Sequence, residues 1–176
     1  MQKYYKAEMD RPLKIMTRVV WVLLALPPIA MTAGCWVSKN SPGSKAFPPP
    51  LVVAGVALLM WAIAHFTRAL APRGFALNDI ELEIDRARSP IKIPLTSITE
   101  ARKLGDAEVK GMLRLMGASG FYGHYGWFWN RKLGRFRLYA SRLKDLVLVK
   151  THKTAFVLSP EDTGTFIADL GKLLKL

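Results

Sequence analysis

The sequence contains few of the residues from which disulfide frameworks and metal centres are built. Its 176 residues include one cysteine, Cys35, and three histidines. A single cysteine cannot form a disulfide within the chain, and it cannot supply a cysteine-rich zinc site. His124 and His152 have neither a cysteine nor a paired carboxylate near them in the sequence. We therefore predict no metal site and no internal disulfide.

The motifs of common catalytic and nucleotide-binding sites are also lacking. The glycine-rich segment 117–123 has no Lys-Ser or Lys-Thr pair of a P-loop, and no helix of a dinucleotide site is indicated after it. Ser119 and Ser141 have no base beside them in the sequence, so a catalytic triad is neither supported nor excluded. We predict no enzymatic activity and no cofactor, and we interpret the glycines as bends beside bulky aromatic residues.

Two long stretches, residues 19–37 and 47–67, contain no charged residue. A helix needs about 20 apolar residues to cross the hydrocarbon core of a bilayer, so we predict transmembrane helices at residues 19–37 and 47–71. Transporters and proton relays need polar groups at depth, and their absence favours a simple anchor. A cleaved signal peptide is the alternative for the first stretch. It is disfavoured because the stretch is long and a second one follows at once.

The distribution of basic residues predicts the orientation of this hairpin. The net charge is +13, and five basic residues precede the first stretch: Lys3, Lys6, Arg11, Lys14 and Arg18. Arg68 and Arg73 follow the second stretch, whereas the loop at 38–46 contains only Lys39 and Lys45. By the positive-inside rule, both termini are cytoplasmic and the loop is external, in a bacterial inner membrane. The same charges attract anionic lipid, so a role beyond topology stays open.

From residue 74 onward the sequence indicates a water-facing domain. Apolar and polar residues alternate, or apolar residues cluster, in six segments typical of strands, at residues 80–85, 91–95, 98–102, 135–140, 146–149 and 154–158. A helix follows, with Ser159 as N-cap, Pro160 at its first position and Asp162 completing a capping box. Residues 105–119 match no clear pattern.

These patterns predict an α+β membrane protein. An N-terminal transmembrane hairpin is followed by about seven antiparallel strands, arranged as a sandwich or partial barrel and capped by a C-terminal helix. Residues 74–176 form this domain, and residues 1–18 form a basic cytoplasmic tail.

Several segments of the domain carry a resemblance to bacterial pleckstrin-homology (PH) domain families that have two N-terminal membrane spans. The similar segments are residues 93–98, 120–123, 133–140, 146–149 and 157–162. The resemblance implies a PH-like fold of two packed antiparallel sheets closed by the C-terminal helix. It implies no catalysis, and it makes a homo-oligomer an option because such domains tend to self-assemble.

The densest basic segment of the domain contains no acidic residue, and it supplies the candidate binding residues Arg131, Lys132, Arg135, Arg137, Arg142 and Lys144. Such a patch suits anionic lipid headgroups or an acidic protein partner. A solvated face adapted to a negative membrane surface is the alternative. Alternation places Trp127 and Trp129 on one face of their strand, where they are candidates for an interfacial or oligomer contact, with core packing as the alternative.

The sequence therefore favours a membrane-anchored, non-enzymatic PH-like binding or assembly module at the inner leaflet. The second hypothesis is an accessory subunit of a membrane enzyme or transporter complex, contacting it through the hairpin. Nucleic-acid binding is not expected, because the chain is tethered to a membrane and its aromatic cluster resembles a stacking platform only superficially.

Overall fold

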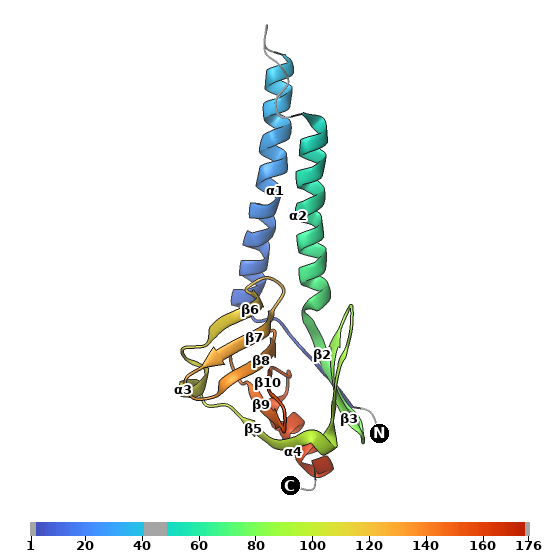
Figure 1. The fold of residues 1–176 in the computed structure, drawn as a ribbon, viewed down its shortest axis with the longest axis vertical. Helices are drawn as coiled ribbons and strands as arrows, with labels where there is room; N and C mark the ends of the chain where they lie inside the picture. Colours follow the sequence, from blue (N-terminus) through green and yellow to red (C-terminus); the bar gives the residue numbers. More distant parts are fainter. Residues whose placement is uncertain (1–2, 41–48, 175–176) are drawn as a thin grey trace.

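The computed structural model describes residues 3–40 and 49–174, and it shows a helical hairpin standing on a β-rich domain (Figure 1). Helix α1 (Arg11–Lys39) and helix α2 (Pro50–Leu70) lie side by side. Both are long and apolar enough to cross a membrane, by length and composition only. The predicted external loop, residues 38–46, falls mostly outside the described residues.

Helix α1 begins well before the predicted span because Asp10 caps it. The backbone N–H of Leu13 donates to Oδ1 of Asp10 at 3.0 Å. Pro50 is the first residue of α2, where its missing N–H costs no hydrogen bond. Apolar side chains of both helices point outward, with 61% of Ile29 and 65% of Leu58 exposed. Such an extensive apolar surface suits lipid better than water.

A four-stranded antiparallel sheet has the order β1-β2-β3-β4. Its strands are β1 (Lys3–Lys6), β2 (Pro72–Leu77), β3 (Glu81–Arg86) and β4 (Ile91–Pro94). Strand β1 comes from the predicted N-terminal tail and pairs with β2, so that Lys3 lies opposite Leu77. This sheet therefore joins residues from both sides of the helical hairpin.

A six-stranded sheet has the order β5-β9-β10-β8-β7-β6. Its strands are β5 (Ile98–Lys103), β6 (Leu113–Ser119), β7 (His124–Asn130), β8 (Gly134–Ala140), β9 (Val147–Thr151) and β10 (Ala155–Leu158). All neighbours are antiparallel except β8 and β10. The connection from β5 to β6 contains the short helix α3 (Asp106–Val109). Because β5 and β6 are opposite edges, this connection crosses from one edge of the sheet to the other.

The predicted fold class is confirmed, since two apolar helices precede packed sheets and a C-terminal helix. The described residues contain ten strands, whereas about seven were expected from their alternation. The additional strands include β1 and β2, whose short or glycine-containing sequences do not alternate clearly. The two sheets do not close into a barrel, and a 3-10 turn, η1 (Leu95–Ser97), links them.

Two hydrophobic cores lie on opposite faces of the six-stranded sheet. The first joins this sheet to the four-stranded sheet and to helix α4 (Thr163–Leu174), around Phe75, Ile84 and Phe166. The second contains Phe136 and Leu148, with residues of the β5–β6 connection packed against it. Complete burial of each such side chain contributes about 1.5–3 kcal/mol, so both faces of the sheet are stabilised.

Helix α4 confirms the predicted C-terminal helix, but the predicted N-cap was wrong. Asp162 caps the helix, because its Oδ1 accepts the backbone N–H of Thr165 at 3.0 Å. Ser159 is buried, and its Oγ accepts the N–H of Ser141 at 2.8 Å. The hydroxyl that was expected to begin the helix therefore holds the β8–β9 loop against the end of β10.

Candidate binding surfaces of the domain

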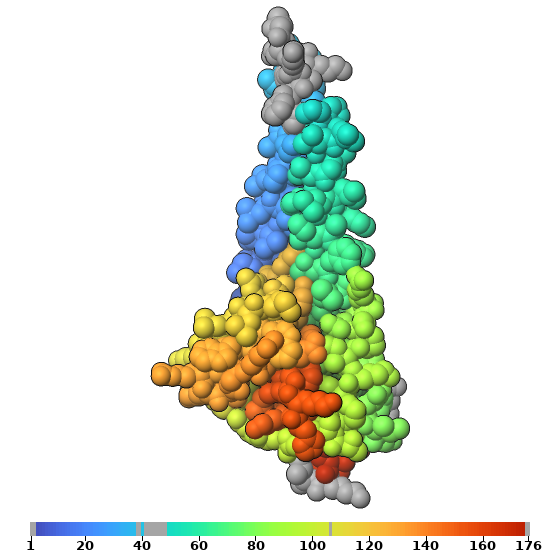
Figure 2. Space-filling view, in the orientation of Figure 1, coloured from blue at the N-terminus to red at the C-terminus, as the bar shows by residue number. Residues whose placement is uncertain are grey.

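The turn between β6 and β7 docks the domain onto the base of the hairpin. The indole N–H of Trp21 on α1 donates to the hydroxyl of Tyr122 at 2.7 Å. The backbone N–H of Tyr122 donates to Oγ1 of Thr17, and the hydroxyl of Tyr125 donates to the carbonyl of Thr67 on α2. Figure 2 shows atoms of this turn, yellow to orange, between the bases of the two helices. The turn thus contacts both helices at once.

The conformation of this turn depends on two left-handed residues. Gly120 has φ +94°, and Tyr122 has φ 60°, which is unfavourable for a residue with a side chain. Ser119 Oγ lies 2.7 Å from His124 Nδ1 across the hairpin, and the N–H of Gly120 donates to the carbonyl of Gly123. Burial lowers the pKa of His124, although Asp10 opposes the shift. The strain at Tyr122 is offset by its hydrogen bonds with Trp21 and Thr17 of α1 and by Arg68 of α2, whose guanidinium carbon lies 6.0 Å from the Tyr122 ring centroid.

The basic residues on β8 surround Trp127 on the neighbouring strand. The guanidinium carbon of Arg135 lies 4.2 Å from the Trp127 ring centroid, and that of Arg137 lies 5.4 Å from it. Arg137 also faces the ring of Phe156. Cation–π contacts of this kind contribute about 0.5–1 kcal/mol at exposed sites. On this face of β8, Arg135 is exposed, Arg137 is half-buried and Tyr139 is buried.

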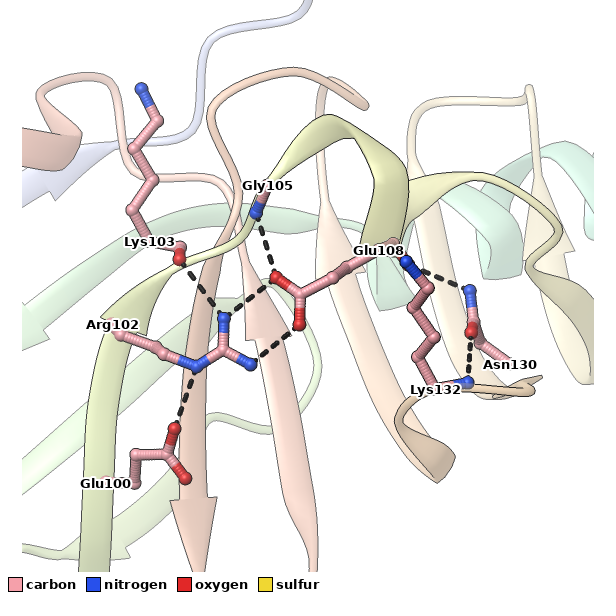
Figure 3. A network of polar contacts seen from close by, with 7 residues as sticks. All are labelled: Glu100, Arg102, Lys103, Gly105, Glu108, Asn130 and Lys132. Carbon is pink, nitrogen blue, oxygen red and sulfur yellow. Dashed lines mark hydrogen bonds and ion pairs between the residues drawn. The ribbon is translucent and has the colours of Figure 1, made fainter.

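The turn that carries Arg131 and Lys132 is held in place by Asn130. This buried amide donates from Nδ2 to the carbonyl of Glu108 at 2.8 Å, and its Oδ1 accepts the N–H of Lys132 (Figure 3). The same Nδ2 also donates to the carbonyl of Lys110 at 2.9 Å. Asn130 therefore joins the basic turn to the connection between β5 and β6. The side chains of Arg131 and Lys132 are exposed.

The same connection is fixed at its other end by an ion pair. Arg102 donates from both terminal nitrogens to the carboxylate of Glu108 at 2.8 Å, and its Nε donates to Glu100 (Figure 3). The N–H of Gly105 also donates to Glu108. These hydrogen bonds, first those from Arg102, lower the pKa of Glu108 to about 2. The two-pronged geometry makes this ion pair stronger than an ordinary surface pair.

The structure brings some of the predicted binding residues together and separates others. Arg131, Lys132 and Arg135 share the β7–β8 end of the sheet, whereas Arg142 and Lys144 follow the opposite end of β8. Arg142 donates to the carbonyls of Pro160 and Glu161, at 2.6 and 2.9 Å, so its guanidinium group holds the loop before α4. The six basic residues therefore do not form one continuous patch.

The alternation predicted for the two tryptophans holds, with Phe128 buried between them in the sequence. Trp127 is half-buried beneath the arginines, and 40% of Trp129 is exposed. The neighbouring edge strand β6 exposes Leu113, Leu115 and Met116 as well. In the sequence, the short alternation at residues 113–115 is the signal for this strand.

Sequence reasoning missed a basic cleft at the end of α2, because its arginines come from separate segments. In the sequence, Arg68 and Arg73 indicate topology, and Arg88 lies between the predicted strands at 80–85 and 91–95. All three line one cleft. Among the residues that the structure describes, no group of three or more His, Cys, Asp and Glu side chains is arranged to hold a metal ion.

A family model described as Bacterial PH domain matches residues 73–174. The chain belongs to this family. The predicted resemblance is thereby confirmed, and the matched region runs from β2 to the end of α4. Strand β1 lies outside the match, yet it completes one sheet of the bacterial PH domain. Comparisons with the curated proteins and with the solved structures found no match. Family membership supports a binding or assembly module, since PH domains are generally non-catalytic.

Proposed function

We propose that this chain is a non-enzymatic binding module that a two-helix anchor holds against the cytoplasmic leaflet of the bacterial inner membrane. The observation that carries this proposal is the pairing of β1 with β2. Lys3 to Lys6 precede both helices, whereas Gly74 to Leu77 follow them, and the two segments are hydrogen-bonded neighbours. This pairing requires both segments to lie on the same side of a membrane. Two spans between the segments, an even number, meet this requirement.

The docking of the β6–β7 turn further supports this arrangement. Trp21 and Thr67 lie in the halves of their helices that are closer to the domain, and they are hydrogen-bonded to tyrosines of the PH domain. The domain therefore has a fixed orientation relative to the hairpin. Basic residues gather at the same level, with Arg11, Lys14 and Arg18 on α1 and Arg68 on α2. Each basic residue close to an anionic leaflet contributes about 1 kcal/mol of attraction.

The basic end of the β7–β8 hairpin is the proposed contact surface for an acidic protein segment. Arg131 and Lys132 are exposed, and Arg135 is held over Trp127. The orange part of this hairpin projects away from the helices in Figure 2, which supports a soluble partner more than the leaflet that holds the anchor. Anionic lipid is the alternative ligand for this surface.

Charge reversal tests this contact. In mild detergent and about 50 mM salt, where screening is weak, the full-length chain should retain an acidic partner that Arg131→Glu with Arg135→Glu loses. The matched control is Lys150→Glu with Lys153→Glu, two exposed residues on another hairpin that form no ion pair within the described residues. Equal recovery of the partner by both variants would reject the surface. If Arg131→Glu with Arg135→Glu lost only the binding to anionic liposomes, the surface would be a lipid-binding surface.

A groove between the two helices favours a second candidate, an accessory subunit of a larger membrane complex. Pro28 and Thr32 of α1 face Ala54 and Ala57 of α2 across an apolar space of about 530 Å³. Small residues allow close approach of another helix in a bilayer. Light scattering of the chain purified in mild detergent tests this candidate, and a lone monomer would count against it.

A further inference from the structure

A cleft of about 610 Å³ lies where α2 meets the PH domain. His65, Phe66 and Arg68 line it from the last turns of α2, Arg73 from β2, and Arg88 from the turn after β3. The N–H of Arg88 donates to the carbonyl of Ala69 at 3.2 Å, and the Arg88 guanidinium carbon lies 5.3 Å from the Phe66 ring centroid. The β3–β4 turn is thus attached to the helix, which gives the cleft a fixed shape.

The charge of this cleft is unbalanced. It contains three arginines and no carboxylate. Within residues 3–40 and 49–174, none of the three guanidinium groups forms an ion pair. Arg68 and Arg73 also line a smaller neighbouring cleft beside Tyr122. Guanidinium groups bind phosphate through paired N–H donors, so three arginines that line one cleft without an acid favour a phosphate-bearing ligand.

The position of the cleft at the domain end of α2 indicates the source of such a phosphate. Helix α2 has 21 residues, and at the rise of an α-helix it spans about 30 Å, the thickness of the hydrocarbon core. Its domain end therefore lies at the level of the phospholipid headgroups. Phe66 is 51% exposed in the last turns of the helix, as aromatic residues are at a membrane interface, and the exposed side chain of Trp61 lies deeper along the same helix. Acyl chains of a lipid bound at the cleft would lie along this apolar surface.

We propose that the cleft lined by Arg68, Arg73 and Arg88 binds the phosphate of an anionic glycerophospholipid from the cytoplasmic leaflet. The inference rests on the proposed membrane anchoring, and it names a lipid site distinct from the protein-binding end of the β7–β8 hairpin. The bound lipid joins α2, β2 and the β3–β4 turn. It therefore stabilises the docked arrangement of hairpin and domain.

Thermal unfolding of the full-length chain in an uncharged detergent tests the site. Dioctanoyl-phosphatidylglycerol at about ten times its Kd should raise the Tm by about 4 °C, and dioctanoyl-phosphatidylcholine should not. Arg73→Gln with Arg88→Gln should abolish the rise. The control Lys150→Gln with Lys153→Gln removes the same charge and should retain it. An equal rise with phosphatidylcholine, or an equal loss in the control, would overturn the proposal.

Two further arms separate the sources of the effect. Glycerol phosphate without acyl chains should give no rise, and a full rise would show a soluble-phosphate site and overturn the lipid assignment. Arg73→Lys with Arg88→Lys keeps the charge but loses the planar fork of the guanidinium groups. The apparent Kd for phosphatidylglycerol, obtained from the rise in Tm, should therefore increase at least threefold. An unchanged apparent Kd would show that only nonspecific electrostatic attraction acts at the cleft, and it would also overturn the proposal. Should the double Gln variant unfold, Arg73→Gln alone repeats the test, since this exposed side chain holds no hydrogen bond in the described residues.

Carbonate extraction of membranes tests the membrane anchor separately from the lipid site. A chain that carbonate releases would contradict the membrane anchor on which the site depends. A chain that stays in the membrane but ignores phosphatidylglycerol would overturn the lipid site alone.

Discussion

Trp21 and Tyr122 are 101 positions apart in the sequence, yet the indole N–H of one donates to the hydroxyl of the other at 2.7 Å. This hydrogen bond joins the first helix of the hairpin to the β6–β7 turn of the PH domain. Their neighbours reinforce it, because the rings of Trp21 and Phe121 meet edge to face at 6.3 Å. The anchor and the domain are therefore one packed unit at this point.

Trp21→Phe should weaken the docking while keeping an apolar ring in place. The substitution removes the donor to Tyr122 and should lower the free energy of unfolding by about 1 kcal/mol. Thermal unfolding of the detergent-solubilised chain measures the loss. Trp36→Phe is the matched control, because 70% of Trp36 is exposed near the far end of α1. Equal losses in both variants would contradict a specific role for the Trp21 hydrogen bond.

Asn130→Ala should be more damaging, because it leaves two partly buried carbonyls without their donor. The amide of Asn130 serves both Glu108 and Lys110 and is 2% exposed. Unsatisfied buried acceptors cost about 1–3 kcal/mol, so we expect a loss of about 2 kcal/mol. Urea titration of the solubilised chain measures it. Lys110→Ala keeps the backbone acceptor and changes only an exposed side chain, so it should be near neutral. Comparable stability of the two variants would refute the anchoring role.

Glu108 should make the stability depend on pH in an acidic window. Its pKa is lowered to about 2 in the folded chain by the hydrogen bonds from Arg102, below the ordinary value of a free Glu. The folded state then binds fewer protons than the unfolded state between these two values. Stability from this carboxylate is complete above the ordinary Glu pKa and is lost as the pH falls toward about 2.

Glu108→Gln provides the measurement for this pH dependence. The variant should be less stable than the natural chain at about pH 6, and the difference should shrink as the pH approaches about 3. Denaturant titrations at both pH values give the two differences. A difference that is constant with pH would show that the ion pair with Arg102 does not stabilise the fold.

His124 should lower the stability in the same direction, at milder pH. Burial lowers its pKa in the folded chain, so the unfolded state binds the proton more readily. Stability is then complete above the ordinary His pKa of about 6.5 and falls as the pH drops below it. The Tm of the natural chain should fall between about pH 7.5 and about pH 5.5, and His124→Asn should fall less. Parallel behaviour of the two chains would contradict a buried neutral imidazole.

The sequence predicted those parts of the fold whose signals are local. Strand β3 alternates cleanly, and Leu82 and Ile84 are indeed completely buried. The C-terminal helix followed from its spacing of apolar residues, although Ser159 did not cap it. A hydroxyl is a suitable partner for any nearby N–H, and that of Ser141, supplied by a distant strand end, bonds to Ser159.

Features that depend on tertiary contacts were beyond local patterns. Strand β1 is four residues long and forms only because β2, on the other side of the hairpin, presents an edge to it. The arginines of the lipid cleft come from a helix, a strand and a turn. Their convergence depends on the sheet and on the hydrogen bond between Arg88 and Ala69. The number of basic residues in the sequence indicated a basic surface, but it did not indicate which arginines line the same cleft.

The orientation of the hairpin is tested most directly by labelling single cysteines with a membrane-impermeant maleimide. In a Cys35→Ser background, Lys45→Cys marks the predicted external loop and Lys153→Cys marks the PH domain. Our account predicts that Lys45→Cys reacts in intact cells, whereas Lys153→Cys reacts only after the inner membrane is permeabilised. Labelling of Lys153→Cys in intact cells, with Lys45→Cys protected, would contradict a domain held at the cytoplasmic leaflet.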